Sequence, residues 1–173
     1  MSESDEADWA RVQAGDLGGL RGLFDKHEQR LFRHAFRLLS SREDAKDAVA
    51  IAFFELWRRR GSVRVVDGSP LPWLLTTVSN SARNLERSAR RYQRVLNRVP
   101  HAIVPEVAAP DESGILAALR KLSEREQSVL TLTILEGYSE KETAAALGVP
   151  PGTVKSRLAR AKARLRNEME GWV

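Results

Sequence analysis

The chain has 173 residues, and 42% of them are hydrophobic, which is enough to fill the cores of one or two small domains. It contains no cysteine, which excludes disulfides and thiolate metal sites, and its net charge is only +5. No apolar run has the length to span a bilayer, and the acidic amino terminus lacks the pattern of a signal peptide, so we expect a cytoplasmic protein without membrane insertion.

The opening residues predict a tail followed by helix. Residues 1–8 hold four acids and no base, and we expect a loose tail there. From Leu17 to Leu39, apolar residues recur at helical spacing. His27 and His34 lie seven residues apart in this stretch, and we interpret them as the polar edge of a helix, because no third metal ligand accompanies them.

Another helix is predicted after Ser41. Ser41 and Asp44, three residues apart, form a capping signal, and small and aromatic apolar residues then mark a buried side. The acids Asp44, Asp47 and Glu55 lie elsewhere on this helix. Three arginines followed by Gly61 end it, as the helix dipole favours.

Residues 62–70 predict a loop whose turn is Asp67-Gly68, and a long helix begins at the prolines that follow. The first part of this helix is apolar, and the second part is rich in arginine. At about 100° per residue, six arginines share a face about 100° wide. They are Arg83, Arg87, Arg90, Arg91, Arg94 and Arg98. This clustering favours contact with phosphates; a solvated face of snorkelling arginines is the alternative.

Residues 99–112 differ from the rest of the chain. A proline stands at every fifth position, at Pro100, Pro105 and Pro110, which excludes a long helix. We interpret this stretch as a flexible linker between two small helical domains, residues 1–98 and residues 113–173. The fold class that we predict is therefore all-α.

The second domain ends in a predicted helix-turn-helix. Ser139 and Glu142 form a capping box, Gly148 suits a helix C-terminus, and a second helix is expected from about Thr153. Apolar residues define its buried side: Val154, Leu158, Ala161, Leu165 and Met169. Basic residues fill the remainder: Lys155, Arg157, Arg160, Lys162, Arg164 and Arg166. An exposed basic second helix is typical of a reader of the DNA major groove, and a solvated basic helix in an ordinary bundle is the alternative.

Both halves contain motifs of one family. The first half resembles the second conserved region of bacterial RNA polymerase sigma factors in Asp44-Ala45-Lys46-Asp47-Ala48-Val49, Phe53, Trp57, Trp73-Leu74-Leu75 and Asn80. The second half is similar to their fourth region in LSEREQSVL, YSEKETAAALGVP and GTVKSRLARA. A short linker between only these two regions is typical of the extracytoplasmic-function (ECF) subfamily.

The resemblance implies roles for individual residues. Asp44, Asp47 and Glu55 would bind the clamp helices of the largest subunit of core RNA polymerase. The loop before Trp73, together with Trp73, Asn80, Arg83 and Arg87, would capture the melted −10 strand. The −35 duplex would contact a set in the second domain that comprises Ser139, Lys155, Ser156, Arg157, Ala159 and Arg160. Many relatives have Gln-Glu where this chain has Ala50-Ile51, which bears on the polymerase contact.

The resemblance implies three partners: core RNA polymerase, promoter DNA and an anti-sigma factor. A free-standing helix-turn-helix regulator that binds operators as a dimer is the alternative, but it leaves the arginine-rich helix and the acidic helix at 41–57 without a purpose. An enzyme is the third reading. No His/Asp/Glu cluster has ligand spacing and no glycine-rich phosphate loop occurs, so we expect no catalytic residue, metal or cofactor.

Overall fold

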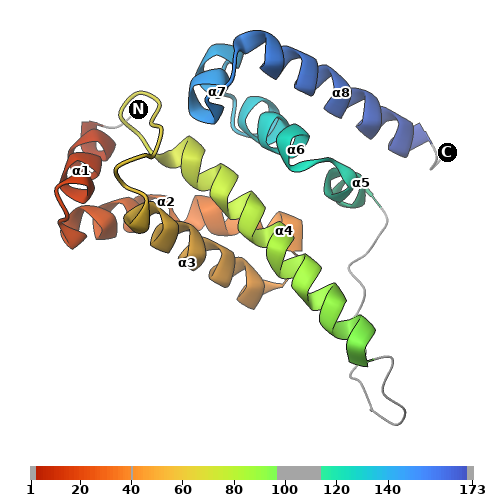
Figure 1. Cartoon of the computed structure of the whole chain (residues 1–173), viewed down its shortest axis with the longest axis horizontal. Helices are drawn as coiled ribbons and strands as arrows, with labels where there is room; N and C mark the ends of the chain where they lie inside the picture. Colours follow the sequence, from red (N-terminus) through yellow and green to blue (C-terminus); the bar gives the residue numbers. More distant parts are fainter. Residues whose placement is uncertain (1–2, 40, 97–113, 171–173) are drawn as a thin grey trace.

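The computed structural model of the chain describes residues 3–39, 41–96 and 114–170 (Figure 1). The first domain comprises α1 (Glu3–Gln13), α2 (Leu17–Leu39), α3 (Arg42–Arg58) and α4 (Leu71–Leu96). The second comprises α5 (Ile115–Lys121), α6 (Glu124–Leu130), the π-helix η1 (Thr131–Leu135), α7 (Glu140–Leu147) and α8 (Pro151–Glu170). The prediction of an all-α protein with two helical domains is confirmed. The expected linker at residues 99–112 lies outside the described residues.

The expectation of a loose tail at residues 1–8 is wrong for the part that the structure describes, because α1 begins at Glu3. Trp9 and Val12 of this helix are buried against the first domain, with exposed fractions of 5% and 0%. Burying such side chains stabilises by about 1.5–3 kcal/mol each. The acids also find partners, since Asp8 pairs with Lys26 of α2. Packing against the first domain therefore stabilises a helix in residues whose acidic composition suggested a loose tail.

Helices α2, α3 and α4 pack around the core of the first domain. The cap predicted for α3 is present, because Ser41 Oγ accepts a hydrogen bond from Asp44 N at 3.3 Å. Large side chains of this core with almost no exposure include Leu23, Leu31, Leu56, Leu74, Leu75 and Val78. The core supports both α3 and the first half of α4, and these helices carry the first set of predicted site residues.

His34 is not on a polar edge, as we had expected, but in the interior, with 1% of its surface exposed. Its Nε2 lies 2.7 Å from Ser79 Oγ, and that hydroxyl donates to the carbonyl oxygen of Leu75 at 3.0 Å. A hydroxyl has one proton, so His34 Nε2 must be the donor and Nδ1 carries no proton. Nδ1 is buried without a hydrogen-bond partner among the described residues. Burial, with a smaller effect of Arg37, lowers the pKa of His34 from 6.5 to about 4.

The helix-turn-helix of the second domain forms as predicted. Ser139 and Glu142 make both hydrogen bonds of the capping box, and Gly148 ends α7 with a left-handed φ of 64°. Helix α8 begins at Pro151 and not at Thr153, because proline fits the first helical position, where its missing N–H is not needed. Val154 and Ala161 are fully buried as expected, whereas Met169 is 47% exposed, so its assignment to the buried side is wrong.

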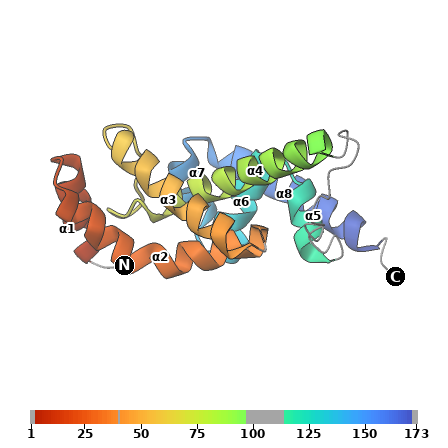
Figure 2. The same ribbon diagram turned by 90° about the horizontal axis from the view of Figure 1, so that it is seen from below.

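The second domain packs against α4 of the first. In Figure 1, α4 lies between the remainder of the first domain and the helices α6 to α8, and Figure 2 shows α6 and α7 alongside α4 from below. Leu132 and Ala146 of the second domain are buried in the hydrophobic cluster of the first. An ion pair between Arg30 of α2 and Glu136 also joins the domains. In the part of the chain that the structure describes, no helix is long and apolar enough to cross a membrane.

Candidate nucleic-acid interface

A groove runs along the first half of α4 and contains two of the residues predicted to contact the −10 strand. Trp73 and Asn80, two helical turns apart, both line it. Helix α3 contributes Ile51 and Glu55, and Arg59 follows at the C-cap of this helix. The remaining lining residues are Arg64, Thr76, Thr77, Ser81, Asn84, Ala146 and Leu147. The groove has a volume of about 490 Å³, and its wall at Ala146 and Leu147 comes from α7 of the second domain.

The loop that leads into α4 is a tight hairpin. Val66 N donates to Ser69 O at 3.1 Å, and Ser69 N donates to Val66 O at 3.0 Å. The two residues between them, Asp67 and Gly68, have φ angles of 50° and 75°. Positive φ at both central positions is the pattern of a type I′ turn, for which Asp-Gly is a preferred sequence. The predicted turn at Asp67-Gly68 is confirmed, and it places the hairpin immediately before Trp73.

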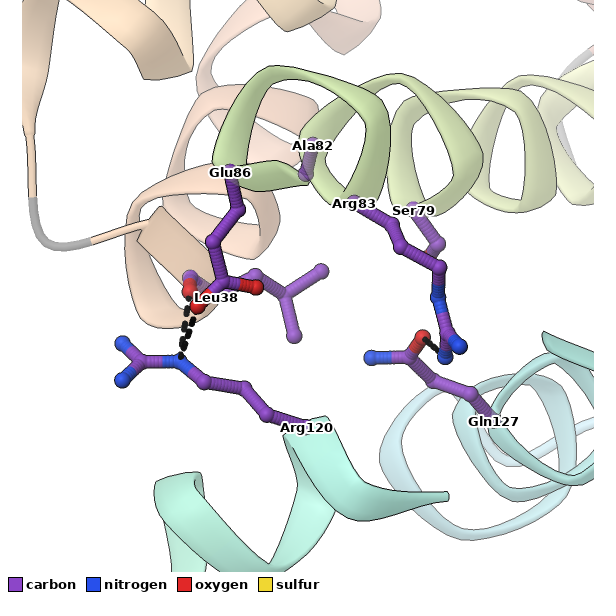
Figure 3. A pocket seen from close by; sticks show the side chains of 7 residues that line it. All are labelled: Leu38, Ser79, Ala82, Arg83, Glu86, Arg120 and Gln127. Carbon is purple, nitrogen blue, oxygen red and sulfur yellow. Dashed lines mark hydrogen bonds and ion pairs between the residues drawn. The ribbon is translucent and has the colours of Figure 1, made fainter. Parts of the chain in front are cut away.

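Arg83 does not join Trp73 and Asn80 in the groove. Its Nη2 donates to the carbonyl oxygen of Leu122 at 2.8 Å and to Gln127 Oε1 at 2.6 Å, and both acceptors belong to the second domain. Figure 3 shows this pair in a separate pocket at the junction of the domains. Arg83 is therefore bound by the second domain in this arrangement.

The other arginines of α4 differ in their surroundings. Arg87 lies 3.6 Å from Glu124 of α6, and Arg90 pairs with Glu86 of its own helix at 3.0 Å. Arg91 and Arg94 are exposed, and Arg98 lies outside the described residues. The predicted basic face thus lies on one continuous helix, and its first two arginines, Arg83 and Arg87, contact the second domain.

The acids of α3 do not share one environment. Asp47 is exposed, and Asp44 lies half-buried in the first turn. Glu55 accepts hydrogen bonds from Arg58 Nη2 at 2.7 Å and from Arg59 Nε at 2.8 Å, and the bond from Arg58, followed by that from Arg59, holds the pKa of its carboxyl below the usual value. The negative charge of Glu55 is thus balanced by Arg58 and Arg59, and its side chain lines the groove. Asp47 does not line the groove.

An apolar patch beside Asp47 was not predicted from the sequence. Phe54 is 64% exposed and Ile51 is 40% exposed, on the same helix as Asp47. Positions 47, 51 and 54 lie within one helical face, since they follow each other at spacings of four and three. The sequence does indicate this patch, because Phe54 directly follows the buried Phe53. Consecutive residues of a helix point in different directions, so both phenylalanines cannot be buried.

The leading half of α8 presents a small polar and basic surface. Lys155, Ser156, Ala159 and Arg160 are all exposed, whereas Arg157 is half-buried. Arg160 Nε donates to the carbonyl oxygen of Ser156 at 3.3 Å, which folds this side chain back along the helix. The structure therefore places four of the predicted −35 residues on one open face.

Ser139, the remaining member of that predicted set, has a structural use. Its hydroxyl donates to Glu142 Oε2 at 2.6 Å and accepts from Glu142 N at 3.2 Å. It is exposed at the N-terminus of α7, so its main effect in this structure is to begin the first helix of the helix-turn-helix.

Comparison with known families gives two matches in order along the chain. Sigma-70 region 2 matches residues 23–92, and Sigma-70, region 4 matches residues 113–165. The ECF RNA polymerase sigma factor SigL of Mycobacterium tuberculosis is 31% identical over 160 residues, which cover 88% of this chain and 90% of that protein. The RNA polymerase sigma factor CarQ of Myxococcus xanthus is 30% identical over 163 residues, which cover 90% and 92%.

Solved structures show the same architecture. CnrH, solved in complex with the cytosolic domain of CnrY, superposes with a TM-score of 0.64 over 98% of this chain and 99% of that chain, and at 24% identity this likeness concerns the fold alone. The sigma factor RpoE of Bartonella quintana, solved with the anti-sigma factor NepR, has a TM-score of 0.54 and is 28% identical, over 85% and 94% of the two chains. With both sigma regions in order and relatives at 30–31% identity over most of its length, the chain belongs to the ECF RNA polymerase sigma factors.

Proposed function

We propose that this chain binds core RNA polymerase and directs it to promoters by recognising the −35 duplex and the melted −10 strand. The observation that supports this most is that one chain carries two distinct candidate DNA surfaces, the groove at Trp73 and Asn80 and the open face of α8. In this proposal the chain is a specificity subunit of the polymerase and not itself an enzyme. As a polymerase subunit it acts in the cytoplasm.

The −35 element is assigned to α8. In helix-turn-helix proteins, the leading half of the second helix reaches base edges in the major groove. Lys155 and Arg160 are long cationic side chains that can contact guanine or phosphate there, and Ser156 and Ala159 leave room for the bases. Arg157, which is half-buried beside them, is suited to phosphate.

The −10 strand is assigned to the groove on α4. Its volume of about 490 Å³ is that of a pocket for a small molecule, which is the size class of an unstacked base. Trp73 offers a ring for stacking, and the Asn80 amide offers a donor and an acceptor for a base edge. Arg64, which also lines the groove, supplies a charge for a phosphate.

Core polymerase is assigned to the exposed face of α3. Asp47 gives this face a charge that suits a basic partner, and Phe54 and Ile51 give it apolar anchors of the kind that dominate interface energies. The apolar pair Ala50-Ile51, where many relatives have Gln-Glu, makes this contact more hydrophobic than in those relatives. An anti-sigma factor, the partner with which RpoE was solved, is a further proposed partner of this chain.

Promoter binding by this route requires the domains to separate. Arg83 can hold a −10 phosphate only after it releases Gln127 and the Leu122 carbonyl. The wall of the groove at Ala146 and Leu147 must also move if a strand is to enter from that side. Assembly with polymerase is therefore proposed to open the arrangement that the free chain adopts.

Run-off transcription with core polymerase on a promoter library tests this function. We expect transcripts from a subset of templates that share both a −35 and a −10 motif. The chain alone should bind the same duplexes poorly, because the −10 surface takes single strands. Specific duplex binding without polymerase, with two-fold symmetric sites and no effect on transcription by core enzyme, would instead identify a dimeric operator-binding regulator.

A further inference from the structure

Asp5 of α1 is a buried carboxylate that joins three parts of the first domain. Its side chain is 8% exposed. Oδ2 accepts a hydrogen bond from Ser69 Oγ at 2.6 Å and lies 2.8 Å from His27 Nε2 of α2. Oδ1 lies 3.9 Å from Lys26 Nζ. The hydroxyl of Ser69 is the only one of these partners that belongs to the hairpin, so Asp5 ties the hairpin to α1 and α2.

Ser69 transmits this anchor to the start of α4. Its hydroxyl accepts a hydrogen bond from Leu71 N at 3.2 Å, and Leu71 is the first residue of α4. That N–H belongs to the first turn, where no helical carbonyl is available to accept it. A chain of two hydrogen bonds therefore connects Asp5 to the helix end that lies two residues before Trp73.

The tip of the hairpin also rests on α1. A Cβ atom added at Gly68 would lie 3.0 Å from Glu6 Cβ and 3.2 Å from Glu6 Cγ. Glycine is required here for two reasons, the close approach of α1 and the positive φ of the turn. Residues 5 and 6 of α1 thus contact both the base and the tip of the hairpin.

We propose that Asp5 is a positioning residue for −10 recognition, which acts through Ser69 on the hairpin and on Trp73. This inference rests on the proposed function, because it assumes that the groove beside the hairpin receives the −10 strand. Holding the hairpin in one position before DNA arrives removes the cost of ordering it during binding. Loss of the Asp5–Ser69 bond should therefore relax the choice of −10 base without affecting the −35 choice.

The experiment uses holoenzyme made from core polymerase and the full chain. Templates that wild-type holoenzyme selects are changed one base at a time in the −10 element, and open complexes are measured by permanganate reactivity. We expect Asp5→Ala and Ser69→Ala each to reduce discrimination at a −10 position by at least about fivefold. The double variant should lose less discrimination than the sum of the two single losses, because both single variants remove the Asp5–Ser69 bond. Ser69→Thr, which keeps the hydroxyl, should retain wild-type discrimination.

Asp8→Ala is the matched control. Asp8 stands one turn from Asp5 on α1 and pairs with Lys26 and Arg11. Among the described residues, it makes no hydrogen bond or ion pair with the hairpin. We expect this variant to keep wild-type −10 discrimination. Equal losses in Asp8→Ala and Asp5→Ala, with Ser69→Ala unchanged, would show that α1 only supports the fold and would overturn the inference.

Two further outcomes separate this inference from the proposed function. A wild-type holoenzyme without any −10 preference would overturn the function and the inference with it. A wild-type preference that Ser69→Ala leaves intact would overturn the inference alone. If Asp5→Ala fails to fold, Ser69→Ala decides, because it removes one hydroxyl from a loop and leaves α1 unchanged.

Discussion

Arg83 Nη2 of α4 lies 2.6 Å from Gln127 Oε1 of α6, so an arginine of the first domain is held by a glutamine of the second. In a second contact nearby, the donor belongs to the second domain and the acceptors belong to the first. Arg120 Nε of α5 donates to the Leu38 carbonyl at 3.1 Å and lies 3.7 Å from Glu86 Oε1 (Figure 3). Hydrogen bonds that involve a charged group contribute about 1.5–3 kcal/mol each when they are partly shielded from water. These contacts stabilise the closed arrangement of the domains.

Removing the Gln127 amide should favour separated domains. Gln127→Ala leaves the Arg83 guanidinium with one acceptor fewer in a half-buried site, so the closed arrangement loses stability. The chain has no cysteine, so dyes attached at Glu43→Cys on α3 and Arg166→Cys on α8 can report the distance between the domains. We expect a larger mean distance in Gln127→Ala. Gln127→Glu, which keeps an acceptor and adds a charge, should remain closed, and equal distances in all three proteins would contradict the prediction.

Lys155→Ala and Arg160→Ala should each reduce transcription from promoters that depend on a −35 element. A lost bidentate base contact costs about 1–3 kcal/mol and relaxes preference at one position, whereas a lost phosphate contact weakens all promoters alike. We expect at least one of the two variants to change the preferred −35 base in sequenced run-off products. Arg166→Ala, an exposed arginine near the end of α8, should keep wild-type preference. Wild-type transcription in both test variants would contradict the prediction and favour the alternative that α8 is a solvated basic helix.

Asn80→Ala should impair promoter opening and leave polymerase binding intact. The change removes an amide from the groove at Trp73 and is expected to cost about 1–3 kcal/mol if that amide pairs with an extruded base. Permanganate footprinting of the promoter bubble measures the effect. Gln93→Ala is the control, because it removes an amide from the same helix beyond the groove. A normal bubble with Asn80→Ala would mean that this residue only covers the surface of α4.

Phe54→Ala should weaken binding to core polymerase by about tenfold, because a central aromatic anchor contributes about 1–2 kcal/mol or more to an interface. Its stability should change little, since the side chain is 64% exposed in the free chain. Asp47→Ala should weaken binding mainly at low salt, as expected for an exposed charge. Titration of labelled protein with core polymerase at two salt concentrations measures both effects. A Phe54→Ala variant that binds as tightly as wild type would place the polymerase surface elsewhere.

Stability should fall on mild acidification because of His34. The pKa of this residue is lowered from 6.5 to about 4 by burial, so between these values the unfolded chain binds a proton that the folded chain does not. The stabilisation by neutral His34 is therefore complete above about pH 6.5 and decreases as the pH falls toward 4. Urea unfolding should show a loss of about 2 kcal/mol at pH 5 relative to pH 7.5. His34→Gln cannot titrate, and a loss of the same size in that variant would exclude His34 as the cause.

Several features of the chain depend on residues close together in the sequence, and these could be predicted from it. The capping boxes at Ser139 and Ser123 join residues three apart, and the type I′ turn at Asp67-Gly68 lies within four residues. The buried side of α8 follows from its helical spacing. Such features are determined by local hydrogen bonds and by the period of the helix, so the fold class, the helix-turn-helix and the family were within reach of the sequence.

Other features depend on partners far apart in the chain, and only the tertiary structure decided them. Ser69 contacts Asp5 over 64 residues, His34 contacts Ser79 over 45, and Arg83 contacts Gln127 over 44. The acidic composition of residues 1–8 led to the wrong expectation of a loose tail, and the helical spacing of Arg83 did not show that Gln127 would bind it in the closed arrangement. No local pattern shows which surface will cover a side chain. Burial and pairing arise when helices meet, so the sequence alone determined the fold class and the local helix signals, and packing determined which charged side chains are exposed and which are paired.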